Sequence, residues 1–208
     1  MLPRIVYCAW LGRDPMSANR TAALASIVLN VGCPVLLFND RTVRSYELPD
    51  APFHPAFDYL SVMHKVDYLR VYLMHHYGGG YTDIKHISVN WSGFFDALEA
   101  SDAYALGYPE VSVANVGHPL EEELHRNIDR LIGVCAFIFK SRTIFTQEWL
   151  DGVHDFLDGS LMILKRSTVY PLEWDAVMGN LLHPLMYRES TDNILRRSEI
   201  MPRFDNYR

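Results

Sequence analysis

Short, uninterrupted apolar runs limit this chain to a small number of folds. Residues 4–10 (RIVYCAW) and 35–38 (VLLF) are rich in β-branched and aromatic side chains, which predicts two buried strands. Residues 18–30 lie between them and follow a helical pattern, with Ser17 as the capping residue. A strand, a helix and a second strand in this order nearly always form a right-handed parallel crossover.

The same alternation continues along the rest of the chain. A loop is predicted over 41–60, and Ser61 then caps a helix over 62–77 that carries an apolar stripe. Strands without polar alternation belong to sheets that are covered on both faces. We therefore expect a single α/β domain over 1–208. The later segments are predicted as strands at 81–84, 103–108 and 132–140 and as helices at 92–100, 120–131, 143–159 and 173–187.

The composition is that of an ordinary soluble globular protein and argues against two kinds of partner. Of the 208 residues, 49% are apolar and 21% are charged, and the net charge of −6 disfavours a broad nucleic-acid surface. No apolar run approaches the length of a transmembrane helix, and the run near the N-terminus is too short for a signal peptide. Cys8, Cys33 and Cys135 lie far apart in apolar runs, which predicts reduced, buried thiols and a reducing compartment.

Polar residues just after the predicted strands are the first candidates for a ligand site. In sheets covered on both faces, ligands bind at the carboxyl ends of the strands. Asp67 and Arg70 lie three residues apart on one face of the 62–77 helix, which indicates either a structural ion pair or part of this site. Three glycines then let that helix end close to the next strand and let the backbone approach a ligand. The residues after the strands are Trp10 to Arg13, Asn39, Asp40, Asp83 to His86, and Tyr108.

Two blocks of the sequence resemble a known family. Residues 67–85 (DYLRVYLMHHYGGGYTDIK) are similar to the signature of DXD-type sugar-nucleotide glycosyltransferases, an Asp-x-x-Arg helix followed by Tyr-Gly-Gly, an aromatic residue and Asp-x-Asp. Residues 2–12 (LPRIVYCAWLG) are similar to the opening block of that family. The form GGGYTDIK looks closest to the capsular-polysaccharide and algal-virus glycan transferases. The resemblance implies a GT-A-like fold with a mixed, mostly parallel central sheet.

The resemblance also implies an activity and its partners. A sugar would move from a nucleotide-sugar donor to an acceptor hydroxyl of a glycan, with the anomeric configuration retained. UDP is the favoured nucleotide because Trp10 matches a uracil-stacking position, and GDP is the alternative. An enzyme of this kind would act in the cytoplasm, or in the host cytoplasm if the chain is viral.

Roles for individual residues follow from their positions in the family pattern. Asp67 and Arg70 would hold sugar hydroxyls and the ribose or phosphate of the donor, and Asp83 would contact ribose, sugar or metal. Asp40 is either a turn acid or a contact to base or ribose, and Tyr7 belongs either to the core or to the base pocket. In a late segment that closes over the donor, the better candidates for contact are Glu173 and Asp175, whereas Trp174 is favoured as a packing residue.

Lys85 departs from the family pattern, because the second Asp of the motif stands there in the family and is a main ligand of Mn²⁺ or Mg²⁺. Lys85 could itself neutralise the diphosphate leaving group. Alternatively the metal is retained, held by Asp83 and a residue from elsewhere in the chain. The intact remainder of the motif favours a retained metal with Asp83 and His183 as ligands, and a catalytic set of Arg70, Asp83 and Lys85. The other candidates for the second ligand are His86, Asp175 and Asp205.

Two other classes of function are alternatives to sugar transfer. Loss of the second Asp is also what a nucleotide-sugar-binding protein without transferase activity would show. An α/β hydrolase is disfavoured because the chain has no G-x-S-x-G sequence.

Overall fold

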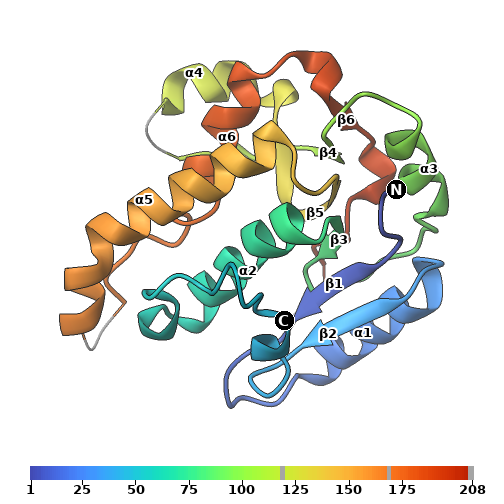
Figure 1. Ribbon diagram of the computed structural model, residues 1–208. Coiled ribbons are helices and arrows are strands. Elements are labelled where there is room, and N and C mark those ends of the chain that lie inside the picture. Colours follow the sequence, from blue (N-terminus) through green and yellow to red (C-terminus); the bar gives the residue numbers. More distant parts are fainter. Residues whose placement is uncertain (118–119, 168–169, 206–208) are drawn as a thin grey trace.

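A computed structural model describes residues 1–117, 120–167 and 170–205, and within these ranges the chain forms a six-stranded sheet of order β2-β1-β3-β5-β4-β6 (Figure 1). Parallel pairing joins β1 to β2, β1 to β3 and β4 to β6, whereas β5 runs antiparallel to both of its neighbours. The expected α/β fold with a mixed, mostly parallel sheet is therefore confirmed. The strands are β1 (Val6–Ala9), β2 (Val35–Phe38), β3 (Gly79–Thr82), β4 (Ala105–Pro109), β5 (Ile132–Phe139) and β6 (Ile194–Arg196).

Helices cover both faces of the sheet (Figure 1). One face packs against α2, α5 and α6, and the other packs against α1 and α3. The shorter α4 lies in the connection between β4 and β5. The helices are α1 (Ala18–Asn30), α2 (Val62–His76), α3 (Ser92–Glu99), α4 (Glu121–Arg126), α5 (Ile144–Arg166) and α6 (Gly179–Arg188).

Alternation along the strands sends successive side chains into two hydrophobic cores. On β1, Tyr7 packs in the core under α2 and α5, whereas Val6 and Cys8 pack in the core under α1 and α3. On β5, Phe137 joins the first core and Ile138 the second. Both faces of these strands are apolar because both are covered, which explains the absence of polar alternation in their sequences.

Most predicted elements are confirmed, with differences at their ends. Ser17 and Ser61 cap their helices as predicted, accepting hydrogen bonds from the backbone of Arg20 and His64. The last helix begins at Gly179 rather than at residue 173, because residues 174–178 form turns instead. The short strand β6 at the edge of the sheet was not predicted.

The glycine run has a different role from a simple turn. Gly78 ends α2 in a left-handed conformation with φ +69°, and Gly79 and Gly80 already belong to β3. A side chain on Gly79 would meet the carbonyl oxygen of Ile5 at 3.0 Å, and one on Gly80 would meet the ring of Trp91 at 3.0 Å. The glycines therefore let β3 pack closely between β1 and the neighbouring core.

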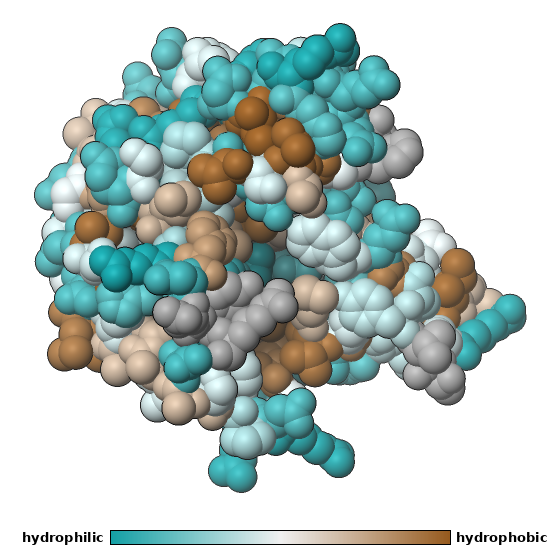
Figure 2. Space-filling view, turned by 180° about the vertical axis from the view of Figure 1, so that it is seen from behind, coloured by the Kyte–Doolittle hydropathy of each residue, from teal (hydrophilic) through white to brown (hydrophobic). Residues whose placement is uncertain are grey.

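The surface seen from the other side is hollowed near the middle of the molecule, and the hollow has a hydrophilic lining (Figure 2). Apolar residues around it are scattered among polar ones rather than gathered in one field. None of the helices in the described ranges has the length and apolar character that crossing a membrane requires.

Candidate functional site

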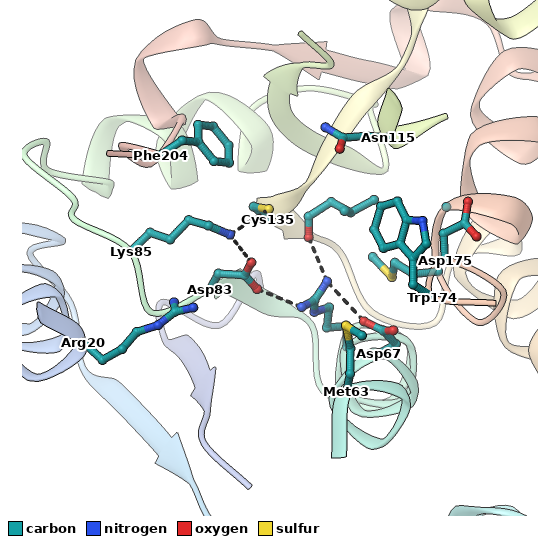
Figure 3. Close-up of a pocket in the computed structure, with 14 residues that line it drawn as sticks. Arg20, Met63, Asp67, Asp83, Lys85, Asn115, Cys135, Trp174, Asp175 and Phe204 are labelled. Carbon is teal, nitrogen blue, oxygen red and sulfur yellow. Dashed lines mark hydrogen bonds and ion pairs between the residues drawn. The ribbon is translucent and has the colours of Figure 1, made fainter. Parts of the chain in front are cut away.

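A cleft opens where the carboxyl end of β3 meets the start of β5. It contains a cavity of about 420 Å³, and a second cavity of about 340 Å³ continues along the end of β1 past Trp10. Arg20, Met63, Arg70 and Asp83 line both, so the two form one continuous cleft. Figure 3 shows the larger cavity between Arg20, Asp83 and Lys85 on one side and Trp174 and Asp175 on the other. Its remaining lining residues are Met63, Asp67, Arg70, Asn115, Val134, Cys135, Met178, Gly179 and Phe204.

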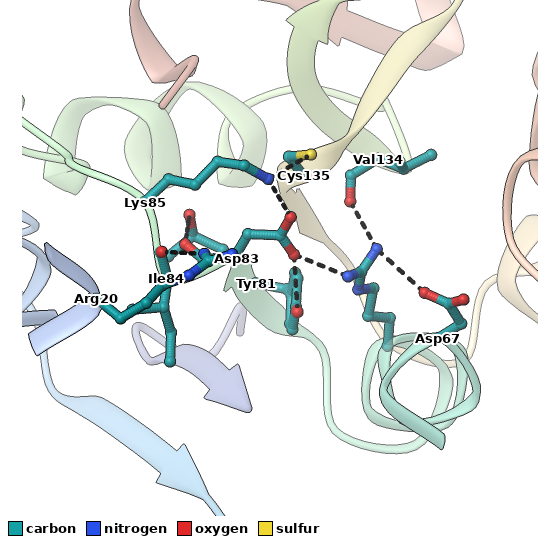
Figure 4. A network of polar contacts seen from close by, with 10 residues as sticks. Arg20, Asp67, Tyr81, Asp83, Ile84, Lys85, Val134 and Cys135 are labelled. Carbon is teal, nitrogen blue, oxygen red and sulfur yellow. Dashed lines mark hydrogen bonds and ion pairs between the residues drawn. The ribbon is translucent and has the colours of Figure 1, made fainter. Parts of the chain in front are cut away.

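Arg70 joins the two acids that the sequence singled out. It projects from α2, and its guanidinium lies 3.4 Å from Asp67 Oδ1 and donates to Asp83 Oδ1 at 2.7 Å (Figure 4). It also donates to the carbonyl oxygen of Val134 on β5 at 3.3 Å. The structure thus brings Asp67 and Arg70 of α2 together with Asp83, which directly follows β3, as the sequence predicted.

Tyr81 supports this cluster from below. Its ring lies under the Arg70 guanidinium at 4.6 Å, and its hydroxyl donates to Asp83 Oδ1 at 3.0 Å. Tyr81 is the aromatic residue that follows the three glycines in the sequence. These two contacts explain why an aromatic residue with a hydroxyl group suits this position.

Lys85 completes the cluster from the other side of Asp83. Its ammonium group donates to Asp83 Oδ2 and lies 3.2 Å from Cys135 Sγ (Figure 4). The ring of Phe204 lies 5.3 Å from the same nitrogen. Both carboxylate oxygens of Asp83 are therefore engaged, Oδ1 by Arg70 and Tyr81 and Oδ2 by Lys85.

These contacts fix the charge of Asp83 and Lys85. Burial alone would raise the pKa of Asp83, but Arg70 and Lys85 together hold it well below its usual value. Burial would lower the pKa of Lys85, yet Asp83 raises it above the ordinary value of a lysine. Asp83 is therefore a carboxylate and Lys85 an ammonium ion at any pH near neutrality.

Asp67 has the opposite character. It is deeply buried, and burial raises its pKa to about 7 in spite of the nearby Arg70 guanidinium. Near neutral pH it is divided between the acid and the carboxylate, so it can both donate and accept hydrogen bonds in the cleft.

The second cavity has an aromatic and cationic wall. Trp10 Nε1 donates to the carbonyl oxygen of Asp14 at 2.9 Å, which fixes the indole at the end of β1. The guanidinium of Arg20 lies 5.8 Å from the Trp10 ring and donates to the carbonyl oxygen of Ile84 at 2.5 Å. A flat ring beside a cation is a platform on which a nucleobase can stack.

The late segment contributes differently from what the sequence suggested. Trp174 is 49% exposed and lines the larger cavity, although its sequence context favoured a packing role. Asp175 is buried and lines the same cavity, and burial raises its pKa. The exposed side chain of Glu173 is outside both parts of the cleft, and its carbonyl oxygen accepts from His64 Nε2 at 2.9 Å.

Like Glu173, three other candidate residues are not among the described residues that line the cleft. Tyr7 is buried in the core and stacks on Phe38 with 5.9 Å between ring centroids. Asp40 is exposed in the turn after β2, and its Oδ2 accepts a hydrogen bond at 2.9 Å from the backbone N–H of Gly12 in the loop after β1. His183 is fully buried on α6, and burial lowers its pKa.

The described residues do not fit a divalent cation site of the usual kind. Within these ranges no three His, Cys, Asp or Glu side chains are grouped so that they could hold a metal ion. His183 is not among the residues that line the cleft with Asp83. Asp83 itself is already bound by two cationic side chains.

Several cleft residues could not be recognised in the sequence. Arg20 lies on the first turns of α1 and carried no motif, and Cys135 lies within the most apolar run of the chain. Asn115 reaches the cavity because Glu110 folds its loop, accepting from the Asn115 side-chain amide at 2.9 Å and from the backbone of Val111 and Ser112. The one signal that was available is the position of Glu110, which directly follows β4; Cys135 lies inside β5 and carried no such signal.

Comparison with protein-family models and with curated proteins gave no match for the chain.

Proposed function

We propose that this chain is a glycosyltransferase that moves a sugar from a nucleotide-sugar donor, in the first instance a UDP-sugar, to a hydroxyl of a glycan acceptor. The observation that supports it is the cluster of Arg70, Asp83 and Lys85 at the end of β3, at the base of a cleft that extends to Trp10. A cationic cluster next to an aromatic platform suits a ligand with a diphosphate next to a base.

In this proposal the donor lies along the continuous cleft. The base stacks on Trp10, and the diphosphate lies near Arg20 and Lys85, where positive charge stabilises the leaving group. The sugar then occupies the larger cavity beside Asp67 and Arg70. Hydrogen bonds from these two side chains orient it for attack.

The chemical step exchanges one bond at the anomeric carbon for another. The bond from that carbon to the diphosphate oxygen breaks, and the acceptor oxygen forms the new bond on the same face of the sugar. The acceptor's hydroxyl proton passes to the departing diphosphate oxygen, so retention needs no separate base. Trp174 and Asp175 form the wall of the cavity opposite Lys85, where an acceptor can enter.

The three free thiols support a reducing compartment, and we place the activity in the cytoplasm. The net charge of −6 supports a small-molecule and glycan partner rather than a nucleic acid.

One observation favours a second function, a nucleotide-sugar-binding protein without transferase activity. Both oxygens of Asp83 are held by neighbouring side chains, so the carboxylate has no oxygen left without a contact. A site that keeps the donor pocket and gives up turnover would look the same.

Donor turnover separates the two functions. The purified chain is incubated with a panel of UDP- and GDP-sugars in Mn²⁺, Mg²⁺ or EDTA, and free UDP or GDP is measured together with donor affinity. Release from at least one donor is expected. Binding without release in every condition supports the second function, and no binding of any nucleotide-sugar contradicts both.

Substitution of Asp83 tests the site itself. Asp83→Ala is expected to abolish transfer, and Asp83→Asn, which keeps the shape of the side chain, to lower its rate by about 100-fold or more. Asp102→Asn is the matched control, because Asp102 is an exposed acid in the loop between α3 and β4. Unchanged turnover in a folded Asp83→Asn variant, checked by circular dichroism, would contradict the assignment.

A further inference from the structure

We propose that Lys85 supplies the positive charge that a divalent cation supplies in the family this chain resembles, so that the cleft binds a diphosphate without a metal ion. The identity of the ligand as a diphosphate rests on the proposed function, whereas the arrangement of charges does not.

Both carboxylate oxygens of Asp83 are occupied by hydrogen bonds. Its Oδ1 accepts from Arg70 at 2.7 Å and from Tyr81 at 3.0 Å, and its Oδ2 accepts from Lys85. A hard divalent cation needs carboxylate oxygens as ligands. To reach Asp83 it would have to displace a cationic side chain and then lie beside it, which electrostatic repulsion opposes.

Cationic side chains outnumber carboxylates around Asp83. A single carboxylate lies between the guanidinium of Arg70 and the ammonium of Lys85, which leaves an excess of one positive charge in this cluster. Asp67 offsets it only in part near neutral pH, because burial raises its pKa to about 7. Asp175 faces the cavity from the opposite wall, and Arg20 adds a further cation on the side of Lys85. The bottom of the cleft, around Arg70, Asp83 and Lys85, therefore attracts anions.

The ammonium group of Lys85 is fixed in place. The backbone N–H of Lys85 donates to the carbonyl oxygen of Asp83 at 2.7 Å, and that of Asp83 donates to Cys135 on β5 at 2.8 Å. The Lys85 side chain is 8% exposed and packs beside Cys135 Sγ and the ring of Phe204. A charge held this rigidly needs little reorganisation when an anion binds.

A purely structural role for Lys85, as the partner of Asp83, makes a different prediction. In that case removal of the ammonium would weaken folding and leave anion affinity unchanged in the molecules that remain folded. Binding measurements therefore distinguish the two roles.

The first test uses inorganic pyrophosphate and UDP as probes, with affinity measured by calorimetry in EDTA and in Mn²⁺. For the wild-type chain we expect binding in EDTA, with an affinity that Mn²⁺ changes by less than about twofold. Lys85→Met should weaken binding at least tenfold in EDTA, and Lys85→Arg should retain it. Absence of binding in EDTA, or unchanged affinity in folded Lys85→Met, would overturn the proposal.

Lys140→Met provides the matched control. Lys140 is also partly buried, and it donates a hydrogen bond to the backbone carbonyl oxygen of Ser101. It directly follows the last residue of β5, whereas the cleft lies near the start of that strand. Its substitution should leave pyrophosphate affinity unchanged, and a tenfold loss there would mean that the effect of Lys85→Met is not specific to the cleft.

A second test restores the acidic residue of the family pattern. In Lys85→Asp, we expect stoichiometric Mn²⁺ binding by electron paramagnetic resonance and pyrophosphate binding that requires Mn²⁺. The wild-type chain should bind no Mn²⁺ at one equivalent. Wild-type binding of Mn²⁺ that disappears in Asp83→Asn would overturn the proposal, and this measurement does not depend on the folding of Lys85→Asp.

The outcomes for this proposal and for the proposed function can be told apart. Cation-independent, Lys85-dependent pyrophosphate binding without turnover of any donor would support the charge assignment and contradict transfer. Turnover of a donor only in the presence of Mn²⁺ would support transfer and contradict the charge assignment.

Discussion

Asp67 shows how burial can outweigh an ion pair. Its carboxyl group lies 3.4 Å from the Arg70 guanidinium, which favours the carboxylate, yet burial raises its pKa to about 7. Asp83 shares the same guanidinium, and its pKa is lowered because Arg70 and, from the other side, Lys85 together outweigh its burial. Two acids on one arginine are thus held in different protonation states.

The raised pKa makes Asp67 a source of pH-dependent stability. A carboxyl group with a higher pKa in the folded than in the unfolded state stabilises the fold fully below pH 4, and this contribution is lost as pH rises to about 7. The free energy of unfolding of the wild type should therefore fall relative to Asp67→Asn between pH 5 and 7, by a few kcal/mol since one pKa unit is about 1.4 kcal/mol. Urea unfolding at pH 5, 6, 7 and 8 measures this difference.

The exposed Asp102 gives the control for this measurement. The difference between the wild type and Asp102→Asn should stay flat over the same pH range. If the curves of the wild type and Asp67→Asn run parallel, Asp67 ionises normally in the folded state.

At the scale of elements, the connection from α2 to β3 depends on backbone contact. Gly79 has φ +102°, and a side chain there would lie 3.0 Å from the carbonyl oxygen of Ile5. Gly79→Ala should lower the free energy of unfolding by about 1–3 kcal/mol, because it adds strain at a left-handed position and a steric clash. Thermal and urea unfolding measure the change.

Gly152 is the matched glycine for this experiment. It lies inside α5 with nothing within 4 Å of an added methyl group. Gly152→Ala should raise stability by up to about 1 kcal/mol through helix propensity alone. Equal effects of the two substitutions would contradict the packing role of Gly79.

Local sequence patterns predicted the elements that have strong local signals. The capping serines and the apolar periodicity placed α1 and α2 almost to the residue, and the spacing of Asp67 and Arg70 placed both on one face of α2. The edge strand β6 has only three residues and forms through pairing with β4, so local sequence patterns do not predict it.

Contacts between distant segments explain what the sequence missed in the cleft. Cys135 and Val134 reach Arg70 and Lys85 because β5 inserts between β3 and β4, an order that local patterns do not encode. The sequence favours Trp174 as a packing residue, whereas the structure exposes it on the turns that precede α6.

At the scale of the molecule, two hydrophobic cores share one sheet. Trp149 on α5 is fully buried in the first core, 5.5 Å from the ring of Phe139, and Trp91 is fully buried in the second. Because β1, β4 and β5 contribute side chains to both, neither core should persist without the other.

We therefore predict a single cooperative unfolding transition for the described domain. Trp149→Ala should lower the free energy of unfolding by about 3–5 kcal/mol and destabilise both cores together. Within each protein, far-UV circular dichroism and tryptophan fluorescence should give the same unfolding midpoint, and that shared midpoint should be lower in the variant than in the wild type. Two separated midpoints would contradict the prediction of one domain.

The reversed direction of β5 has a consequence for protein engineering. Pro109, the last residue of β4, pairs with Ile132, the first residue of β5. The segment 110–131 therefore leaves the sheet and returns to it at neighbouring points. Segments anchored in this way tolerate replacement by sequences of other lengths where the residues that pack in the core, here Val116, Leu124 and Leu131, are kept. Since this segment carries Asn115 to the rim of the cavity, grafting it between related chains would exchange the entrance of the cleft and leave the charges at the end of β3 in place.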